Sequence, residues 1–83
     1  MDLRTYALTI EWQNRFNTIN VQCRDDDEAL RTAYAVIRHR ERDRAEGAKA
    51  TVHAAGFREV GAVHQEGTRV LTKHGAEYQQ AEG

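Results

Sequence analysis

The stretch that decides the fold of this chain is residues 25–37, which read DDDEALRTAYAVI. Asp25 is followed three residues later by Glu28, the spacing of a helix capping box, and an acidic first turn suits the positive end of the helix dipole. We predict a helix from about residue 26 to 45, ended by Gly47, whose first three turns pack on a sheet. The apolar residues that recur at helical spacing form its buried face: Ala29, Leu30, Ala33, Tyr34, Val36 and Ile37.

Upstream of the helix, residues 3–12 and 17–23 alternate apolar and polar side chains with the period of a half-buried strand. Gln13-Asn14 is predicted to form a two-residue turn between them, because Asn tolerates positive φ. A slip of one residue would place the apolar side chains of the two strands on opposite faces. The register that keeps them together sets Ile10 opposite Asn17, Leu8 opposite Ile19 and Tyr6 opposite Val21, and it includes Trp12 and Cys23 in the same face.

Downstream of the helix the alternation is weaker. Residues 50–54 and 57–65 read as strands interrupted at Gly56, so they form either two strands or one bent strand, and residues 68–73 form another. A turn at Glu66-Gly67 is predicted to set Val63 opposite Val70 and Ala62 opposite Leu71.

The whole pattern predicts a single α+β domain over residues 1–74, in the order β-β-α-β-β-β. An antiparallel sheet of four to five strands carries one helix on one face. Residues 75–83 are polar and are predicted to form a disordered tail. The chain of 83 residues has one cysteine, so no internal disulfide can form, and a homodimer is one way to stabilise so small a core. With no long apolar run and no signal-peptide pattern, we expect a cytoplasmic protein without membrane contact.

Arginines gather at the end of the predicted helix, although the net charge of the chain is only −1. They either complement the helix dipole or bind an acidic or phosphate-bearing partner, for which the planar guanidinium is well suited. Interleaved Glu41 and Asp43 weaken the phosphate interpretation. Beyond Ile37 no core remains to cover the helix, so the predicted partner-binding residues are Arg38, Arg40, Arg42 and Arg44.

No pattern in the sequence predicts a catalytic site, a metal site or a cofactor. The acidic run that opens the helix lacks the spaced ligands and internal glycine of a calcium loop. The histidines make no HxxxH or HExxH pair, although His53 and His64 could become neighbours across a sheet. Cys23 has no CxxC partner, and its position on the predicted core face is typical of an inert thiol.

Burial in the core is the preferred interpretation of the aromatic residues. Tyr6 and Trp12 lie on the predicted core face, and Phe16 and Phe57 lie near turns. Stacking on RNA bases is the alternative, but the chain has no motif typical of RNA-binding sheets, and the helix needs the same face. The opposite face of the sheet is polar and is a second candidate for a binding surface.

Two segments resemble known families. Residues 55–61, AGFREVG, resemble the GF-x-x-x-G stretch near the acetyl-coenzyme A site of GCN5-related N-acetyltransferases. That family's R/Q-x-x-G-x-G/A loop is missing, so no site residue is carried over. Residues 18–37, TINVQCRDDDEALRTAYAVI, together with the order of elements, are similar to small phage-encoded accessory proteins, including anti-CRISPR inhibitors of multisubunit interference complexes. This resemblance implies a stoichiometric inhibitor that binds a protein surface.

The expected function is therefore a non-enzymatic protein-binding module, encoded by a phage or mobile element, that blocks a surface of a host complex handling nucleic acid. The alternative is a small nucleic-acid-binding protein that uses the same arginines, with an affinity that falls steeply as salt is added. An enzyme is the third class, because a thin core with one helix leaves little room for a small-molecule pocket.

Overall fold

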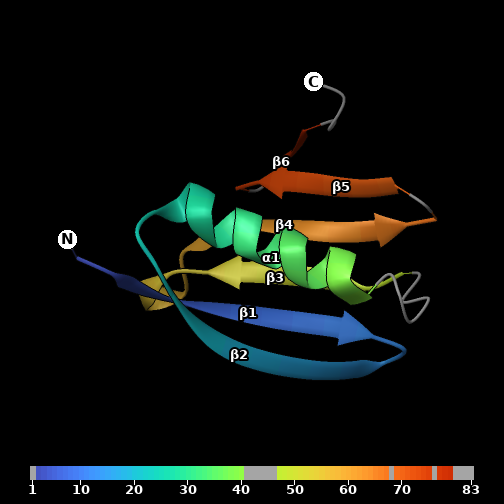
Figure 1. Cartoon of the computed structure of the whole chain (residues 1–83), viewed down its shortest axis with the longest axis horizontal. Helices are drawn as coiled ribbons and strands as arrows, with labels where there is room; N and C mark the ends of the chain where they lie inside the picture. Colours follow the sequence, from blue (N-terminus) through green and yellow to red (C-terminus); the bar gives the residue numbers. More distant parts are fainter. Residues whose placement is uncertain (1, 41–46, 68, 76, 80–83) are drawn as a thin grey trace.

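The computed structural model of the chain describes residues 2–40, 47–67, 69–75 and 77–79. In these residues a six-stranded antiparallel sheet carries a helix across one of its faces (Figure 1). The α+β architecture predicted from the sequence is thereby confirmed. The elements in chain order are β1 (Arg4–Trp12), β2 (Arg15–Cys23), α1 (Asp26–Arg40), β3 (Lys49–His53), the 3₁₀ turn η2 (Ala55–Phe57), β4 (Glu59–Glu66), β5 (Arg69–His74) and β6 (Glu77–Gln79).

The first hairpin has the predicted register. Leu8 lies opposite Ile19, and Tyr6 lies opposite Val21. Both turn residues have positive φ, 51° for Gln13 and 61° for Asn14, as a two-residue turn that follows the twist of the strands requires. The second strand is longer than predicted, because pairing starts directly after the turn, with Arg15 opposite Trp12.

The helix begins at Asp26, where the sequence predicted it to begin. The Glu28 backbone N–H donates to Asp25 Oδ1 at 2.8 Å, which is the expected cap. The Glu28 side chain reaches back one residue further than in the usual capping box and accepts from the Arg24 N–H at 2.5 Å. The description of α1 ends at Arg40, so residues 41–45, over which the helix was predicted to continue, lie outside the described residues.

The strand order is β2-β1-β3-β4-β5-β6, so α1 crosses over the sheet to connect β2 with β3 on the other side of β1. β3 and β4 are separate strands that pair antiparallel, and the alternative of one bent strand is wrong. The reason is the left-handed backbone of two consecutive residues, Gly56 with φ 75° and Phe57 with φ 60°, which reverses the chain.

The last hairpin differs from its predicted register. Val63 pairs with Thr72 rather than with Val70, and Ala62 pairs with Lys73 rather than with Leu71. The turn starts one residue later than predicted, since Glu66 still pairs with Arg69 and Gly67 takes the positive φ of 62°. Within the segment predicted as a polar tail, residues 77–79 form β6, while residues 76 and 80–83 lie outside the described part of the chain.

The core lies between α1 and the sheet face that the sequence pattern selected. Tyr6, Cys23 and Ile37 are fully buried there, and Trp12 is half-buried. The expectation that all the aromatics enter the core is wrong for three of them, because Phe16 is 68%, Phe57 is 90% and Tyr34 is 41% exposed. Tyr34 was predicted on the buried face of the helix, but it lies at the border of that face and beside the hollow between α1 and β5. The remaining buried residues of this core include Leu8, Ile10, Ala29, Leu30, Ala33, Ala50, Val52 and Val63.

One helix is too narrow to cover this sheet. A helix with its side chains is about 10–12 Å wide, whereas six strands at about 4.8 Å spacing span roughly 24 Å. α1 lies over the middle of the sheet, and Ile19 and Val21 of β2 and Val70 of β5 remain half-buried on either side (Figure 1). The other face, which we call the open face, has no described element packed over it. Among the described residues, no helix combines the length and the apolar character needed to cross a bilayer.

Replacing Asp25 with alanine removes the acceptor for the Glu28 N–H at the start of α1. We expect Asp25→Ala to lower the free energy of unfolding by about 1 kcal/mol, or roughly 4–8 °C in Tm. Asp25→Ser keeps an acceptor at the cap and should remain close to the wild type. Urea unfolding of the three proteins measures the difference, and equal losses for both variants would contradict the capping role.

Candidate functional site

The open face carries polar side chains that are matched across neighbouring strands. Thr9 Oγ1 lies 3.2 Å from Thr18 Oγ1, and Gln22 Nε2 donates to Thr5 Oγ1 at 2.8 Å. Lys73 Nζ lies 3.4 Å from Glu59 Oε2. Two further pairs of opposite charge face each other in the ladder, Glu11 with Lys49 and Glu66 with Arg69. Because each of these cations faces an acid, this face does not form a positive surface for phosphates.

The most unusual feature beside the open face is the loop that joins β3 to β4, residues 54–58, here called the Phe57 loop. Phe57 is the most exposed large apolar residue that the structure describes, at 90%. Its φ of 60° lies in the left-handed region, which is uncommon for bulky residues and costs about 1–2 kcal/mol. The Ala54 N–H closes the loop by donating to the Arg58 carbonyl oxygen at 2.8 Å. An exposed aromatic is therefore held in an unfavourable backbone conformation.

A three-residue clamp fastens the Phe57 loop to the helix. Arg58 donates from both terminal guanidinium nitrogens to the two carboxylate oxygens of Asp26, each at 2.9 Å. The buried Tyr6 hydroxyl donates to Asp26 Oδ1 at 2.8 Å. Asp26 is the first residue of α1, where a carboxylate also suits the helix dipole. The clamp thus joins β1, α1 and the loop, and a bidentate pair restrains orientation as well as distance.

The clamp also shifts the proton affinities of its members. The hydrogen bonds from Arg58, and then from Tyr6, hold the pKa of Asp26 below its usual value. Burial raises the pKa of the Tyr6 phenol, and the hydrogen bond to Asp26 raises it further. Both shifts favour the state in which Asp26 is ionised and Tyr6 is neutral, which is the hydrogen-bonded state.

Two hollows flank the Phe57 loop. One, of about 350 Å³, opens on the open face and is lined by Thr5, Ala7, Asn20, His53, Ala54, Ala55, Gly56 and Phe57. The other, of about 470 Å³, lies beside the clamp and is lined by Arg4, Thr5, Tyr6, Ala54, Ala55 and Arg58. The loop therefore forms a ridge between two depressions, with Phe57 on the open-face side.

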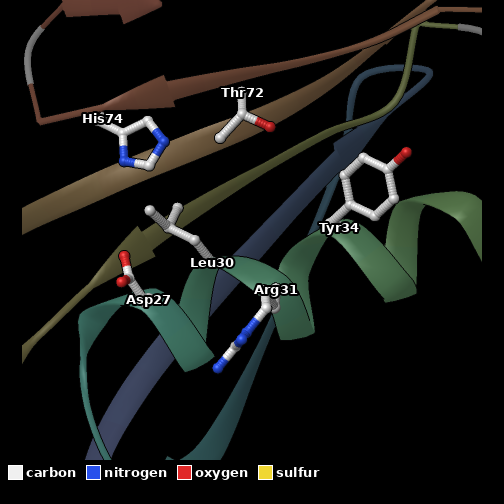
Figure 2. A pocket seen from close by; sticks show the side chains of 6 residues that line it. All are labelled: Asp27, Leu30, Arg31, Tyr34, Thr72 and His74. Carbon is white, nitrogen blue, oxygen red and sulfur yellow. The ribbon is translucent and has the colours of Figure 1, made fainter. Parts of the chain in front are cut away.

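A third hollow, of about 270 Å³, lies between α1 and β5. Figure 2 shows His74 and Thr72 on the strand facing Leu30 and Asp27 on the helix, while the Arg31 side chain points away from the strands. Asp27 and His74 could form an acid–base pair, but no hydrogen bond or ion pair joins them. The volume of this hollow is just below the range of about 300–1,000 Å³ that is usual for small-molecule sites, and its described lining residues form no assembled catalytic group.

The predicted arginine site at the helix end is only partly described. Arg38 lies in the last described turn of α1 and is exposed. Arg40 ends the described helix, and its side chain lies outside the described residues, as do Arg42 and Arg44 entirely. The role of these four residues in binding stays a prediction.

The other candidates from the sequence do not assemble into a chemical site. His53 lies opposite Glu59 and His64 lies opposite Lys49, so the two histidines are four residues apart along the β3–β4 ladder. Cys23 is a buried thiol 3.8 Å from Thr32 Oγ1. Among the described residues no three His, Cys, Asp or Glu side chains gather in a way that could hold a metal ion.

Sequence reasoning missed both Phe57 as an exposed residue and Arg58 as a clamp. Gly56 was a signal of an interruption between strands, but a glycine does not show which way the next side chain points. Arg58 and Asp26 are 32 residues apart, and no local pattern joins them. Comparisons of the chain with protein-family models, with curated proteins and with solved structures find no match.

Protonation of Asp26 should weaken the clamp. Because the pKa of this group is lowered in the folded state, its contribution to stability is present above the unfolded value of about 4 and is lost as the pH falls through the folded value. We expect Asp26→Asn to remove this part of the acid dependence. Its size is about 0.5–1 kcal/mol, since the Asp26 side chain is 40% exposed and solvent screens the pair.

Urea unfolding between pH 2 and pH 7 measures this effect, with Asp27→Asn as the matched control. Asp27 is the neighbouring exposed carboxylate of the same helical turn, whereas the guanidinium of Arg58 bonds to Asp26. The acid slope should flatten only in the Asp26→Asn protein, and the same flattening in both variants would contradict the clamp.

Proposed function

We propose that this chain is a non-enzymatic protein-binding module that inserts Phe57 into an apolar pocket of its partner. The observation that carries this proposal is a 90% exposed phenylalanine held at a φ of 60° on a clamped loop. Strained residues persist only where the surrounding structure fixes them, and they concentrate at functional positions. Two ties fix this one, the Ala54–Arg58 hydrogen bond and the Arg58–Asp26 pair.

A protein partner suits this surface better than a small molecule or a nucleic acid. Rigid aromatic anchors that fill a pocket on the partner dominate the binding energy of protein interfaces. The hollow of about 350 Å³ beside Phe57 could receive a side chain of the partner in return. Binding to a phosphate backbone requires an excess of cations, whereas the cations of the open face are each matched by an acid.

The proposed mode of action is occupation of a surface. A small domain with a preformed anchor loses little conformational freedom on binding, which favours tight stoichiometric inhibition. We propose that the blocked surface belongs to a host complex that handles nucleic acid, in line with the sequence resemblance. Location in a reducing compartment such as the cytoplasm is part of the proposal.

Replacing Phe57 separates binding from stability. Asn tolerates the left-handed conformation, and an exposed phenyl ring contributes little to the core, so Phe57→Asn should be as stable as the wild type or up to about 1 kcal/mol more stable. The same change should abolish affinity capture of the partner from a lysate of the native host. Thermal unfolding and mass spectrometry of the captured proteins measure the two effects.

The matched control is Phe16→Asn, which removes the other exposed phenylalanine of the open face, at its opposite end. The partner should still be captured by this variant. Capture that survives Phe57→Asn would contradict the proposed anchor, and a loss of stability in that variant would contradict the backbone strain.

The nucleic-acid alternative predicts different behaviour. Binding through the helix-end arginines would be insensitive to Phe57→Asn and would fall steeply between low and moderate salt. Nuclease treatment of the lysate before capture would also remove the signal. Capture that resists nuclease and salt but is lost in Phe57→Asn supports the protein-binding module.

A further inference from the structure

The outer edge of β2 is long and carries no charge between its ends. β2 spans nine residues, whereas β6 at the other edge of the sheet spans three, and no described element lies beside β2 (Figure 1). Residues 16–23 contain no charged side chain and no proline. Monomeric proteins protect such edges with lysines, prolines or bulges, because an open edge pairs with other strands. None of these devices occurs in β2.

The hairpin register shows which backbone groups of β2 point outward. A two-residue turn is closed by a hydrogen-bonded pair, here Trp12 with Arg15, and bonded and non-bonded pairs then alternate along the ladder. Every second residue of β2 therefore directs its N–H and C=O away from β1. These residues are Phe16, Thr18, Asn20 and Gln22.

We propose that two copies of this chain dimerise by antiparallel pairing of their β2 edges about a two-fold axis at Ile19. In this register Phe16 pairs with the second copy's Gln22 and Thr18 with its Asn20. All four outward-facing residues of each strand then exchange hydrogen bonds with the other copy. The two sheets become one sheet of twelve strands, and each copy uses the same surface, as a two-fold interface requires.

The charges at the ends of β2 favour this antiparallel arrangement. Arg15 and Arg24 bound the uncharged segment on its two sides. In the proposed register Arg15 lies opposite the second copy's Cys23, and Arg24 lies opposite its Asn14, so no like charges meet. A parallel pairing would set each arginine beside its own counterpart, which is unfavourable.

Dimerisation would also cover apolar surface that α1 does not reach. Ile19 and Val21 lie on the helix face of β2 and are half-buried in the single chain. At the two-fold axis Ile19 meets Ile19 of the second copy, and Val21 meets Asn17. A chain of 83 residues buries only a small core, and the dimer would extend this core across the β2 edge.

A charge at Ile19 tests the register. Sedimentation velocity of the purified chain should show a species of twice 9.5 kDa at high concentration. Ile19→Lys and Ile19→Glu should each weaken dimerisation at least tenfold, because like charges meet at the axis, while an equimolar mixture of the two should recover a dimer. A chain that stays monomeric at several hundred micromolar, or a dimer unaffected by both substitutions, would overturn the proposal.

Disulfide trapping gives a second measurement that does not depend on the strength of the dimer. Residues 19 of the two copies form a non-hydrogen-bonded pair with Cα atoms about 4.5 Å apart, within the range of a disulfide. Ile19→Cys should therefore cross-link on mild oxidation, and Val21→Cys, which faces Asn17 of the other copy, should not. Equal cross-linking of both variants, or of neither, would count against this register.

The dimer and the Phe57 anchor can be tested separately. The dimer experiments use the purified chain alone, and Phe57→Asn should dimerise like the wild type because Phe57 lies outside β2. Failure of dimerisation would therefore leave the proposed partner site in place, and failure of partner capture would leave the dimer in place.

Discussion

The packing of α1 against the middle of the sheet is the interaction on which the other features of this molecule depend. Ile37, Ala33 and Leu30 of the helix are buried against Leu8, Val52 and Val63 of the strands. Because a single helix covers only two or three strands, the same contact that makes the core also leaves sheet surface uncovered. The half-buried Ile19 and Val21 beside the β2 edge are a consequence of this mismatch in width.

The clamp of Tyr6, Asp26 and Arg58 connects this core to the proposed binding surface. Asp26 is the first residue of the helix, and its carboxylate accepts hydrogen bonds from the Tyr6 hydroxyl of β1 and from the Arg58 guanidinium of the loop. A surface loop that lacked such a tie would relax the left-handed backbone of Phe57 and lose the preformed orientation of the ring. The Arg58–Asp26 ion pair is exposed to solvent and therefore adds little to the free energy of unfolding. Its main effect is to fix the orientation of the Phe57 loop relative to the helix.

The two proposed interfaces lie on different parts of the sheet and use different physics. The Phe57 loop offers one rigid aromatic side chain, whereas the β2 edge offers backbone hydrogen bonds with little side-chain selectivity. A two-fold dimer through β2 would present two Phe57 loops on one extended sheet. Two Phe57 loops held in this way could bind two equivalent sites on a symmetric or repetitive partner. Once the first loop is bound, the rigid sheet sets the effective concentration of the second loop at its site.

The sequence by itself determined the first hairpin, its register, the start of the helix and the face that is buried. These features arise from short-range causes: period-two alternation, a turn that tolerates positive φ at Asn14, and the Asp25 cap. Only the tertiary structure decided that β3 pairs with β1 and leaves β2 at an edge, that Arg58 reaches Asp26, and that Phe57 faces solvent. Each of these depends on contacts between residues far apart in the chain. The direction of the Phe57 side chain also depends on its left-handed backbone, which is uncommon for a bulky residue and which the residue type does not predict.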